Sequence, residues 1–352
     1  RAYLKYHDDK LIIASGTGIF TYINFENFNK NSFIANVIPS NLQELIDHEE
    51  FYRNGGYGIK GLLIHEDKIY ISFSNQMKKD CFNTAIIVAD FNLVNLKFEK
   101  FFFPKNCINK INSHGNFKII HSGGMMFPFS NQRILFTVGE YKFRVHAQTK
   151  ENIFGKIIAI NKNTKDYQII QMGHRNPQGL YYDSNNDFLI STDHGPQGGD
   201  EININLSPNK KIKNYGWPIS SYGEHYGFTK RDDSHPLYIK APLYKSHEKY
   251  GFVEPIKYFT PSIAISQIIK VPFKFNGAGT NQYLVGALGH NIKEGDLSIH
   301  HIELNNANNE ILKYNVLPLG ERIRDMIYVD KLNKVFLFLE NTSSIGVLEA
   351  EN

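Results

Sequence analysis

Short apolar runs, rich in β-branched and aromatic residues and separated by turn-forming residues, recur along almost the whole chain of 352 residues. Runs of this length and composition predict β-strands. In each group of runs, an inner strand is followed by a turn and a hairpin, so the pattern predicts an all-β fold, a six-bladed β-propeller. A jelly roll or a β-sandwich is the alternative, although such folds normally use far fewer residues. The six strand clusters span residues 10–39, 59–103, 124–172, 178–205, 262–317 and 324–348.

Two segments break this β pattern. Residues 41–53 are expected to form a short surface helix, because Asn41 can cap it and apolar residues recur at helical spacing. Residues 207–257 are irregular and rich in Lys, Ser, His, Tyr and Pro, and a loop this long inside a compact domain is usually functional. We therefore expect one propeller domain over residues 1–352 that carries a long irregular insertion at 207–257.

The bulk composition is that of an ordinary globular protein, with 41% hydrophobic and 21% charged residues. No apolar run approaches the roughly 18 residues needed to cross a bilayer, so no membrane span is expected. The net charge of +4 comes mainly from lysines scattered among asparagines rather than from basic blocks, so nucleic acid is not an expected partner. The sequence begins at Arg1 without an apolar leader, which leaves open whether a leader or an anchor has been removed.

The two cysteines, Cys81 and Cys107, do not form a metal-binding motif. In the predicted propeller, Cys81 follows the second strand of its cluster and Cys107 follows the fourth. These two connections emerge on the same face of an up-and-down blade. The cysteines can therefore form a disulfide in an oxidising compartment, or remain two buried thiols. The sequence does not choose between these alternatives.

Residues able to do acid–base, anion-binding or metal chemistry gather in punctuated segments between residues 121 and 218. Each segment combines such a side chain with turn-forming Gly, Pro or Asn, and apolar strand-like runs separate the segments. A site assembled from the loops of a rigid β scaffold is distributed along a sequence in this way. The segments are 121–124, 173–180, 193–203 and 214–218.

The motifs recur in a fixed order: His-Ser-Gly-Gly at 121–124, Gly-Lys at 155–156, Gly-His-Arg-Asn-Pro-Gln-Gly-Leu at 173–180, His-Gly-Pro at 194–196, Asp-Glu-Ile-Asn at 200–203, Asn-Tyr-Gly-Trp-Pro at 214–218 and Arg-Ile-Arg-Asp at 322–325. As a set, this series resembles the soluble quinoprotein glucose dehydrogenase and aldose sugar dehydrogenase family. The resemblance implies a six-bladed propeller that uses pyrroloquinoline quinone (PQQ) and calcium. It also implies oxidation of aldose sugars or related alcohols, an external electron acceptor and a periplasmic or secreted location.

Oxidation of an alcohol by hydride transfer requires a base for the hydroxyl proton and a cation near the accepting oxygen. The resemblance implies that His121 is the base, that Arg175 faces the reactive quinone carbonyl and that Asn176 hydrogen-bonds the cofactor. Arg322 and Arg324, two residues apart and so on one side of an extended strand, are expected to hold the cofactor's carboxylates. A lone His or Arg in a propeller is usually structural, so these roles rest on the ordered set.

The same resemblance places a calcium ion against the backbone carbonyls of Gly195 and Pro196. Carbonyl ligands suit a hard cation, and Gly and Pro permit the exposed turn that such ligation needs. Glu201 and the carbonyl of Tyr215 match a further calcium position in the family, although a surface position explains Glu201 equally well. Trp217 is expected to pack in the core at a blade corner rather than to contact substrate.

Two positions depart from the family pattern. Family members usually carry Gln where this chain has Lys60, and a cofactor-binding Lys where this chain has Gly289 followed by His290. Either Lys60 supplies the missing positive charge from the opposite wall of the pocket, or the quinone site has decayed or been repurposed. Glu140 stands where the family commonly has Asp, which is a milder change.

Two other functions are compatible with the sequence. One is a propeller without quinone that binds a carbohydrate or a protein partner through the same face. The other is a calcium-dependent hydrolase of the lactonase-like kind. The joint presence of the His and Arg candidates favours the dehydrogenase, whereas Lys60 and Gly289 argue against it. The 207–257 loop carries no motif that identifies a substrate.

Overall fold

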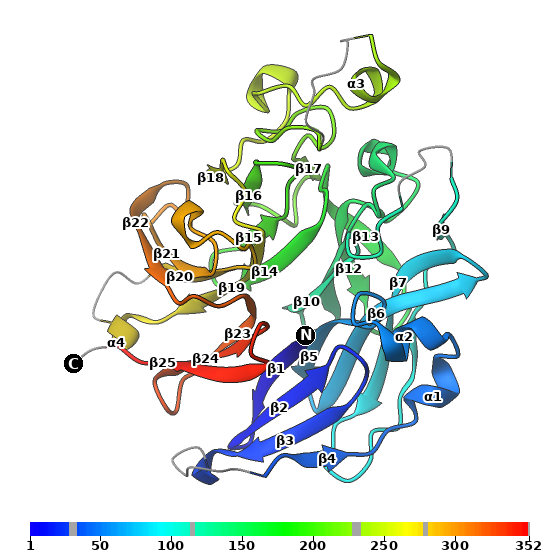
Figure 1. Ribbon diagram of the computed structural model, residues 1–352, viewed down its shortest axis with the longest axis vertical. Coiled ribbons are helices and arrows are strands. Elements are labelled where there is room, and N and C mark those ends of the chain that lie inside the picture. Colours follow the sequence, from blue (N-terminus) through cyan, green and yellow to red (C-terminus); the bar gives the residue numbers. More distant parts are fainter. Residues whose placement is uncertain (28–33, 113–116, 227–233, 277–280, 351–352) are drawn as a thin grey trace.

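The structure is a computed structural model that describes residues 1–27, 34–112, 117–226, 234–276 and 281–350. Six sheets are arranged around a common centre, which confirms the predicted six-bladed β-propeller (Figure 1). Neighbouring strands within each blade pair almost entirely antiparallel. None of the helices in the described ranges is long and apolar enough to cross a membrane.

The first three blades have four or five strands each. Blade 1 comprises β1 (Ala2–His7), β2 (Lys10–Ser15), β3 (Phe20–Asn24) and β4 (Asn36–Ile38). Blade 2 comprises β5 (Ile59–His65), β6 (Lys68–Lys78), β7 (Cys81–Asp90) and β8 (Glu99–Phe102), with β9 (Ile108–Asn109) also paired to β7. Blade 3 comprises β10 (Gly123–Ser130), β11 (Arg133–Val138), β12 (Lys156–Asn161), β13 (Tyr167–Met172) and, parallel to β13, β17 (Lys213–Asn214).

The last three blades have four, four and three strands. Blade 4 comprises β14 (Pro177–Asp183), β15 (Phe188–Asp193), β16 (Asp200–Asn205) and β18 (Lys257–Phe259). Blade 5 comprises β19 (Ile265–Val271), β20 (Gln282–Ala287), β21 (Ser298–Leu304) and β22 (Ile311–Pro318), and blade 6 comprises β23 (Ile323–Val329), β24 (Lys334–Leu339) and β25 (Ser344–Leu348). The short helices are α1 (Leu42–Leu45), α2 (Glu49–Arg53), α3 (Pro236–Lys240), α4 (Phe273–Asn276), η1 (Phe25–Asn27), η2 (Arg144–Gln148), η3 (Glu248–Tyr250) and η4 (Ile292–Glu294).

Strand β1, which the sequence pattern did not predict, is the innermost strand of blade 1 and closes the ring. The inner strands contact one another in the order β1, β5, β10, β14, β19 and β23, and β23 contacts β1 again. At this closure the backbone N–H of Leu4 donates to Asp325 Oδ2 at 2.7 Å. Asp325 is 1% exposed, so the first and last blades are joined by a buried hydrogen bond to a carboxylate.

Hydroxyl groups on the second strands of blades 2, 3 and 4 bind each of these blades to the next one. Each hydroxyl donates to a backbone carbonyl at the inner strand of the following blade, so these three interfaces combine apolar packing with a buried hydrogen bond. The pairs are Ser72 Oγ with the Gly124 carbonyl at 2.5 Å, Thr137 Oγ1 with the Pro177 carbonyl at 3.1 Å, and Thr192 Oγ1 with the Ser266 carbonyl at 2.6 Å. Gly61 is required at one of these interfaces, because a Cβ there would lie 2.3 Å from the Gly124 carbonyl oxygen.

The inner strands of blades 2 to 6 each lose regular pairing with their neighbour near the first residues of the strand. Register shifts fall between residues 59 and 61, 123 and 126, 177 and 179, 265 and 268, and 323 and 325. In three blades the extra residue is Lys60, Gln178 or Arg324, and each of these lines the central cavity. A bulge turns a side chain out of the regular alternation. The bulges therefore aim chosen residues at the propeller axis.

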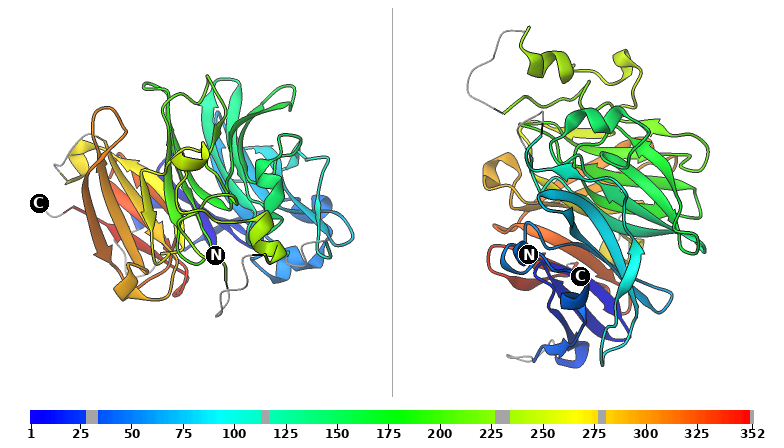
Figure 2. Two further views of the ribbon diagram at one scale, coloured as in Figure 1. Left: turned by 90° about the horizontal axis from the view of Figure 1, so that it is seen from above. Right: turned by 90° about the vertical axis from the view of Figure 1, so that its right-hand side faces the viewer.

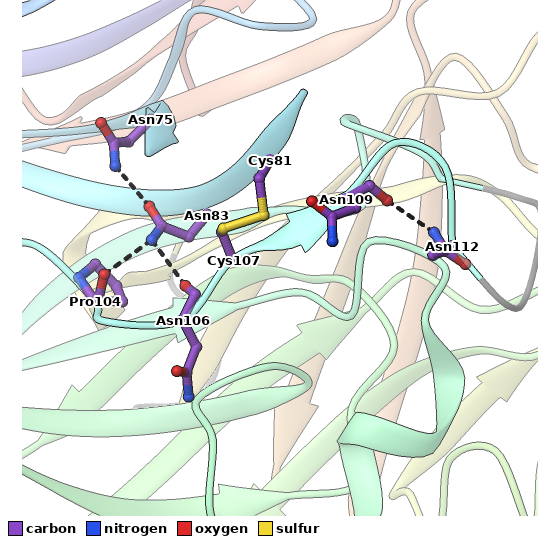
Figure 3. The surroundings of a disulfide bond; sticks show 8 residues. All are labelled: Asn75, Cys81, Asn83, Pro104, Asn106, Cys107, Asn109 and Asn112. Carbon is purple, nitrogen blue, oxygen red and sulfur yellow. Dashed lines mark hydrogen bonds between the residues drawn. A yellow bond between two sulfur atoms is a disulfide. The ribbon is translucent and has the colours of Figure 1, made fainter. Parts of the chain in front are cut away.

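Cys81 and Cys107 are joined by a disulfide with a Cα–Cα distance of 5.4 Å, which decides between the two alternatives that the sequence left open (Figure 3). The bond links the start of β7 to the segment that precedes β9. Beside it, Asn83 Nδ2 donates to the carbonyls of Pro104 and Asn106 at 3.0 and 2.9 Å. These bonds anchor the same connection at a second point.

The predicted helix over residues 41–53 is wrong in detail. It is split into α1 and α2, because Ile46 after α1 is extended, with φ −126° and ψ 104°. Asn41 makes no side-chain cap and instead accepts the backbone N–H of Phe98 at 2.7 Å. The segment 207–257 contains β17, α3 and η3, and its α3 end projects beyond the blades (Figures 1 and 2).

Candidate active site

A cavity of about 240 Å³ opens at the centre of the ring of inner strands. All six inner strands, or the residues that directly precede them, contribute to its wall. The cationic residues of the wall are Arg1, Lys60, Arg322 and Arg324, and its histidines are His121, His194 and His290. The structure thus brings together His121, Asn176, Lys60, Arg322 and Arg324, which the sequence placed in one site.

His121 lies on the turn before β10 and is 6% exposed. Its Nδ1 is 3.0 Å from Glu140 Oε1, and its Nε2 is 3.2 Å from Arg175 Nη2. Because the guanidinium can only donate, Nε2 must accept, so Nδ1 carries the ring proton and donates it to Glu140. Burial, followed by the charge of Arg175, holds the pKa of His121 well below its usual range. The imidazole is therefore neutral and has a lone pair at Nε2.

Glu140 is completely buried, and its Oε2 has no hydrogen-bond partner among the described residues. Burial raises the pKa of this carboxyl to about 7, although Arg175 and Arg144 act in the opposite direction. The Glu140 side chain is long enough to reach the imidazole and accept its Nδ1–H. The carboxyl therefore titrates near neutral pH, while the imidazole that it binds stays neutral.

Arg175 and Asn176 are fixed from behind by Asp193, a residue to which the sequence gave no chemical role. Asp193 Oδ2 accepts the backbone N–H of Arg175 at 2.9 Å, and Oδ1 accepts that of Asn176 at 2.7 Å. His174, which is fully buried, lies 3.1 Å from Asp193 Oδ2 through Nδ1 and is stacked on Tyr215. Buried residues thus hold the turn that presents Arg175 and Asn176.

The Arg175 side chain contacts His121 and lies over the ring of Trp217. Its Nη1 donates to the His194 carbonyl at 2.6 Å, and its guanidinium carbon is 5.7 Å from the centre of the Trp217 ring. Trp217 is 4% exposed and packs with Ala147 and Leu243, as the sequence predicted for a core position. It also borders the candidate catalytic arginine, which the sequence did not predict.

Arg322 and Arg324 share one carboxylate, that of Glu340 after β24. Arg324 Nε donates to Glu340 Oε2 at 2.5 Å, and Arg322 Nη2 lies 3.9 Å from Oε1. Burial alone would raise the pKa of Glu340, but Arg324 above all lowers it, to about 2. The proximity of Arg324, followed by burial, lowers the pKa of Arg1 to about 10. This wall holds three guanidinium groups against one carboxylate and so favours a ligand with further negative charge.

Replacing Glu340 with Gln is expected to lower the free energy of unfolding of the ligand-free protein by about 2 kcal/mol, because the three guanidinium groups lose their carboxylate. Since the pKa of Glu340 is depressed, this stabilisation is present above the unfolded-state pKa of 4.5 and is lost as the pH falls toward about 2. Urea unfolding of both proteins near neutral pH and in acid measures the effect. Equal stability at neutral pH would contradict it.

Lys60 points into the cavity and not to solvent, since it is only 4% exposed. Its Nζ donates to the Gly56 carbonyl, and it makes no ion pair with a carboxylate in the described part of the chain. Burial, followed by the charges of Arg1 and Arg324, lowers its pKa well below the usual value for lysine. An anion bound in the cavity would offset both effects.

Gly289 also lines the cavity, on the side of Arg322, and no larger residue fits at this position. A Cβ at this position would be 1.9 Å from Cγ of Asp296. The Asp296 Oδ2 accepts the backbone N–H groups of His290 and Asn291 at 2.6 and 2.8 Å, so the carboxylate holds this loop. His290 Nε2 in turn lies 2.9 Å from Arg322 Nη1. With the Asp296 carboxylate in this position, a lysine side chain at position 289 has no room.

The residues expected to bind calcium contact other parts of the protein instead of lining the central cavity. Gly195 and Pro196 are not part of the cavity wall, and the Pro196 carbonyl accepts the Ser262 hydroxyl at 3.0 Å. Glu201 Oε1 lies 3.2 Å from His247 Nε2, and the Tyr215 carbonyl also faces this buried imidazole. Within the described ranges, no three His, Cys, Asp or Glu side chains form a group that could hold a metal ion. Ligation by the predicted carbonyls therefore stays a prediction.

The sequence did not predict a role for three residues that contribute to the site: Arg1, Asp193 and Glu340. Glu340 lies outside the recognised motifs, and Arg1 precedes a strand that was not predicted. Asp193 lies inside a motif, next to His194 at the end of a predicted strand. This position is the signal that could have identified it. Only the closed ring brings Arg1 beside Arg324.

The ring of six blades defines a β-propeller with a basic, histidine-containing cavity at its centre. Residues 37–345 match the model of the Glucose / Sorbosone dehydrogenase family, and the chain belongs to this family. It is 31% identical to the aldose sugar dehydrogenase YliI of Escherichia coli (strain K12) over 160 residues, which cover 42% of this chain and 39% of that protein. The chain thus aligns with about two fifths of the length of its curated relatives.

Solved structures share the fold over the whole chain. A crystal structure of glucose dehydrogenase has a TM-score of 0.74 and 21% identity, covering 100% of this chain and 96% of that one. The PQQ-bound form of the aldose sugar dehydrogenase from Streptomyces coelicolor has a TM-score of 0.63 and 16% identity, covering 100% and 97%. At these identities the likeness establishes the architecture.

Proposed function

We propose that the protein is a PQQ-dependent dehydrogenase that oxidises aldose sugars or related alcohols and passes the electrons to an external acceptor. The observation that carries this proposal is the buried His121–Glu140 pair at the edge of a strongly cationic cavity. Membership of a family of sugar dehydrogenases supports the reaction class. The PQQ-bound structure of a protein with the same fold supports the cofactor.

The cavity has the charge that PQQ requires. PQQ is a flat molecule with three carboxylates. The wall carries four cationic side chains, and among the described residues Glu340 is the carboxylate that forms ion pairs with two of them. Arg322 and Arg324 would hold carboxylates as paired donors, with Arg1 beside them and Lys60 on another inner strand. Asn176 would donate from Nδ2, because its Oδ1 already accepts the N–H of Gly123 at 3.1 Å. When bound, PQQ supplies the two-electron acceptor for hydride from the sugar carbon.

The residues of the chain would handle the proton. His121 Nε2 takes the proton of the substrate hydroxyl. Meanwhile the Nδ1–H group keeps donating its hydrogen bond to Glu140, and this carboxylate stabilises the imidazolium that forms. Arg175 must give up its contact with Nε2 when the hydroxyl arrives, and its charge then lies beside the reacting oxygen. Gly195, Pro196, Glu201 and Tyr215 remain the proposed calcium ligands, and the proton transfer to His121 does not involve them.

Lys60 provides a direct test of cofactor binding. Lys60→Met is expected to weaken PQQ binding by about 10- to 100-fold, because it removes a buried charge-assisted contact. Titration calorimetry with and without calcium measures this, and Lys68→Met serves as the control, since Lys68 makes only an exposed ion pair with Asp90 at 2.7 Å. Adding Gly289→Lys to Lys60→Met should not restore binding, because the Asp296 carboxylate fills the space.

The outcomes separate the competing functions. Dye-linked sugar oxidation that depends on added PQQ supports the proposal. A folded protein that takes up no PQQ at micromolar concentration would point to a propeller that only binds a partner. Calcium-dependent ester or lactone cleavage without quinone would point to a hydrolase. The Cys81–Cys107 disulfide supports a periplasmic or secreted location, because such bonds persist in oxidising compartments.

A further inference from the structure

A second cluster of hydrogen-bond donors lies next to the catalytic candidates, outside the cofactor cavity. The guanidinium carbons of Arg144 and Arg175 are 5.4 and 5.7 Å from the centre of the Trp217 ring. Arg175 is 4% exposed, and so is Trp217, whose Nε1 has no hydrogen-bond partner in the described ranges. Three donor-only groups therefore meet at one aromatic ring, and no acceptor satisfies the buried indole N–H.

No carboxylate neutralises these guanidinium groups through an ion pair within the described residues. The partner of Arg144 is a neutral imidazole: Nη1 lies 2.9 Å from His225 Nδ1, while His225 Nε2 lies 2.8 Å from the Ala241 carbonyl. The carbonyl requires a proton on Nε2, so Nδ1 accepts from Arg144. Burial, followed by the charge of Arg144, lowers the pKa of His225 to about 4, which keeps this ring neutral.

Two lysines add to the positive charge. Tyr141 and Lys142 both adopt left-handed backbone conformations, with φ of 53° and 68°, which is unusual for residues with side chains. The Tyr141 carbonyl accepts the backbone N–H of Lys118 at 3.0 Å, so both lysines lie at the turn that follows Glu140. Burial, followed by the charges of Arg144, Lys118 and Arg175, lowers the pKa of Lys142, which is the direction expected where no anion is bound. Of the buried carboxylates nearby, Asp193 accepts backbone N–H groups, whereas Glu140 binds His121 through Oε1 and leaves Oε2 without a partner among the described residues. Glu140 therefore places one negative charge near Arg144 and Arg175, without an ion pair to either.

We propose that this donor cluster binds the anionic group of the substrate, so that the substrate class is an aldose derivative that carries a carboxylate or a phosphate. An oxyanion would accept hydrogen bonds from the guanidinium groups of Arg144 and Arg175 and balance the lysines. The assignment of this ligand as a substrate rests on the proposed dehydrogenase function. The binding itself does not, because Arg144 and Trp217 have no role in holding the cofactor and the binding is measured without it.

Trp217 makes the binding measurable, because it is the one tryptophan of the chain. Its fluorescence is followed in protein without quinone during titration with glucuronate, glucose 6-phosphate and glucose. Both anionic sugars, or the one whose anion fits, should change the emission saturably, and glucose at equal concentrations should not. Added salt should weaken the binding. Whichever anionic sugar binds more tightly identifies the carboxylate or the phosphate as the natural group.

Arg144→Gln should weaken the binding of the anionic sugar by about 10- to 100-fold, because it removes a charge-assisted contact. Lys142→Gln is the second variant, in case the first does not fold. Arg133→Gln is the matched control, since Arg133 lies over Phe129 on the outer part of blade 3 and should leave binding unchanged. Circular dichroism verifies that each variant is folded.

Three results would overturn this inference: no emission change with either anionic sugar, equal binding of glucose, or full binding by Arg144→Gln. Inorganic phosphate that binds as tightly as glucose 6-phosphate would show a simple anion site and would also overturn it. Since quinone is absent from the titration, a failure here is distinct from a failure of PQQ-dependent turnover. If turnover is found but charged and neutral sugars react equally, the dehydrogenase stands and the anionic substrate class falls.

Discussion

Replacing His121 with Gln is expected to lower kcat of the PQQ-loaded protein by about 10²- to 10⁴-fold, the usual contribution of a positioned general base. The side chain keeps its size and polarity but cannot take up a proton at the position of Nε2. Steady-state sugar oxidation with a dye acceptor measures the loss. His65→Gln, at the outer end of β5, is the matched control and should retain activity. Unchanged kcat in His121→Gln would remove this residue from the chemistry.

The pH dependence should follow the His121–Glu140 pair. Because Glu140 must be ionised to accept Nδ1–H, kcat/KM should rise with pH up to about 7, the raised pKa of this carboxyl. Stability should change in the opposite direction: the unfolded chain loses this proton near pH 4.5, whereas the folded protein keeps it until about 7. Rising pH through this window therefore costs folding free energy while it activates the enzyme. Glu140→Gln should abolish both trends.

Asp193→Ala is expected to reduce the free energy of unfolding by about 3–5 kcal/mol, because it leaves two buried backbone N–H groups and His174 without their acceptor. Urea unfolding measures the loss. Asp193→Asn should cost less, since it keeps the shape and one acceptor oxygen. Asp90→Ala, at an exposed ion pair, is the control and should change stability by less than about 1 kcal/mol.

A kinetic readout shows whether Asp193 also positions Arg175. In Asp193→Asn, which should remain folded, the turn at Arg175 and Asn176 is held by one good acceptor in place of two. We expect kcat to fall while the affinity for PQQ, held mainly by Arg322 and Arg324, changes little. Equal losses in kcat and PQQ affinity would indicate a general loss of structure instead.

The propeller itself could be predicted from the sequence, because clusters of strand-like runs and turn signals are local features. The structure also places the motif residues His121, Asn176, Arg322 and Arg324 on the wall of one cavity, whereas their roles stay predictions. The position of Lys60 in the cavity could only be offered as one of two alternatives. Its burial depends on the bulge between Ile59 and Gly61, which no period-two pattern reveals.

Other parts of the site depend on contacts between residues far apart in the chain. Arg1 meets Arg324 only because β1 closes the ring against β23. Nothing in the local sequence around Gly289 shows that Asp296 occupies the space of a missing side chain. Likewise, the helix is split where Ile46 is extended and buried in the core, which the local helical spacing does not show. Such effects are tertiary, and propensity alone cannot predict them.

The recurrent pairing irregularity at the start of the inner strands has an evolutionary consequence. A residue at such a position projects toward the axis without a partner in the ladder, so its exchange leaves the blade core untouched. Gln can give way to Lys at position 60, for instance, while Ile59 and Leu62 stay packed. Ligand preference and thermal robustness can therefore be selected separately, with new pocket chemistry sampled one blade at a time on an unaltered frame.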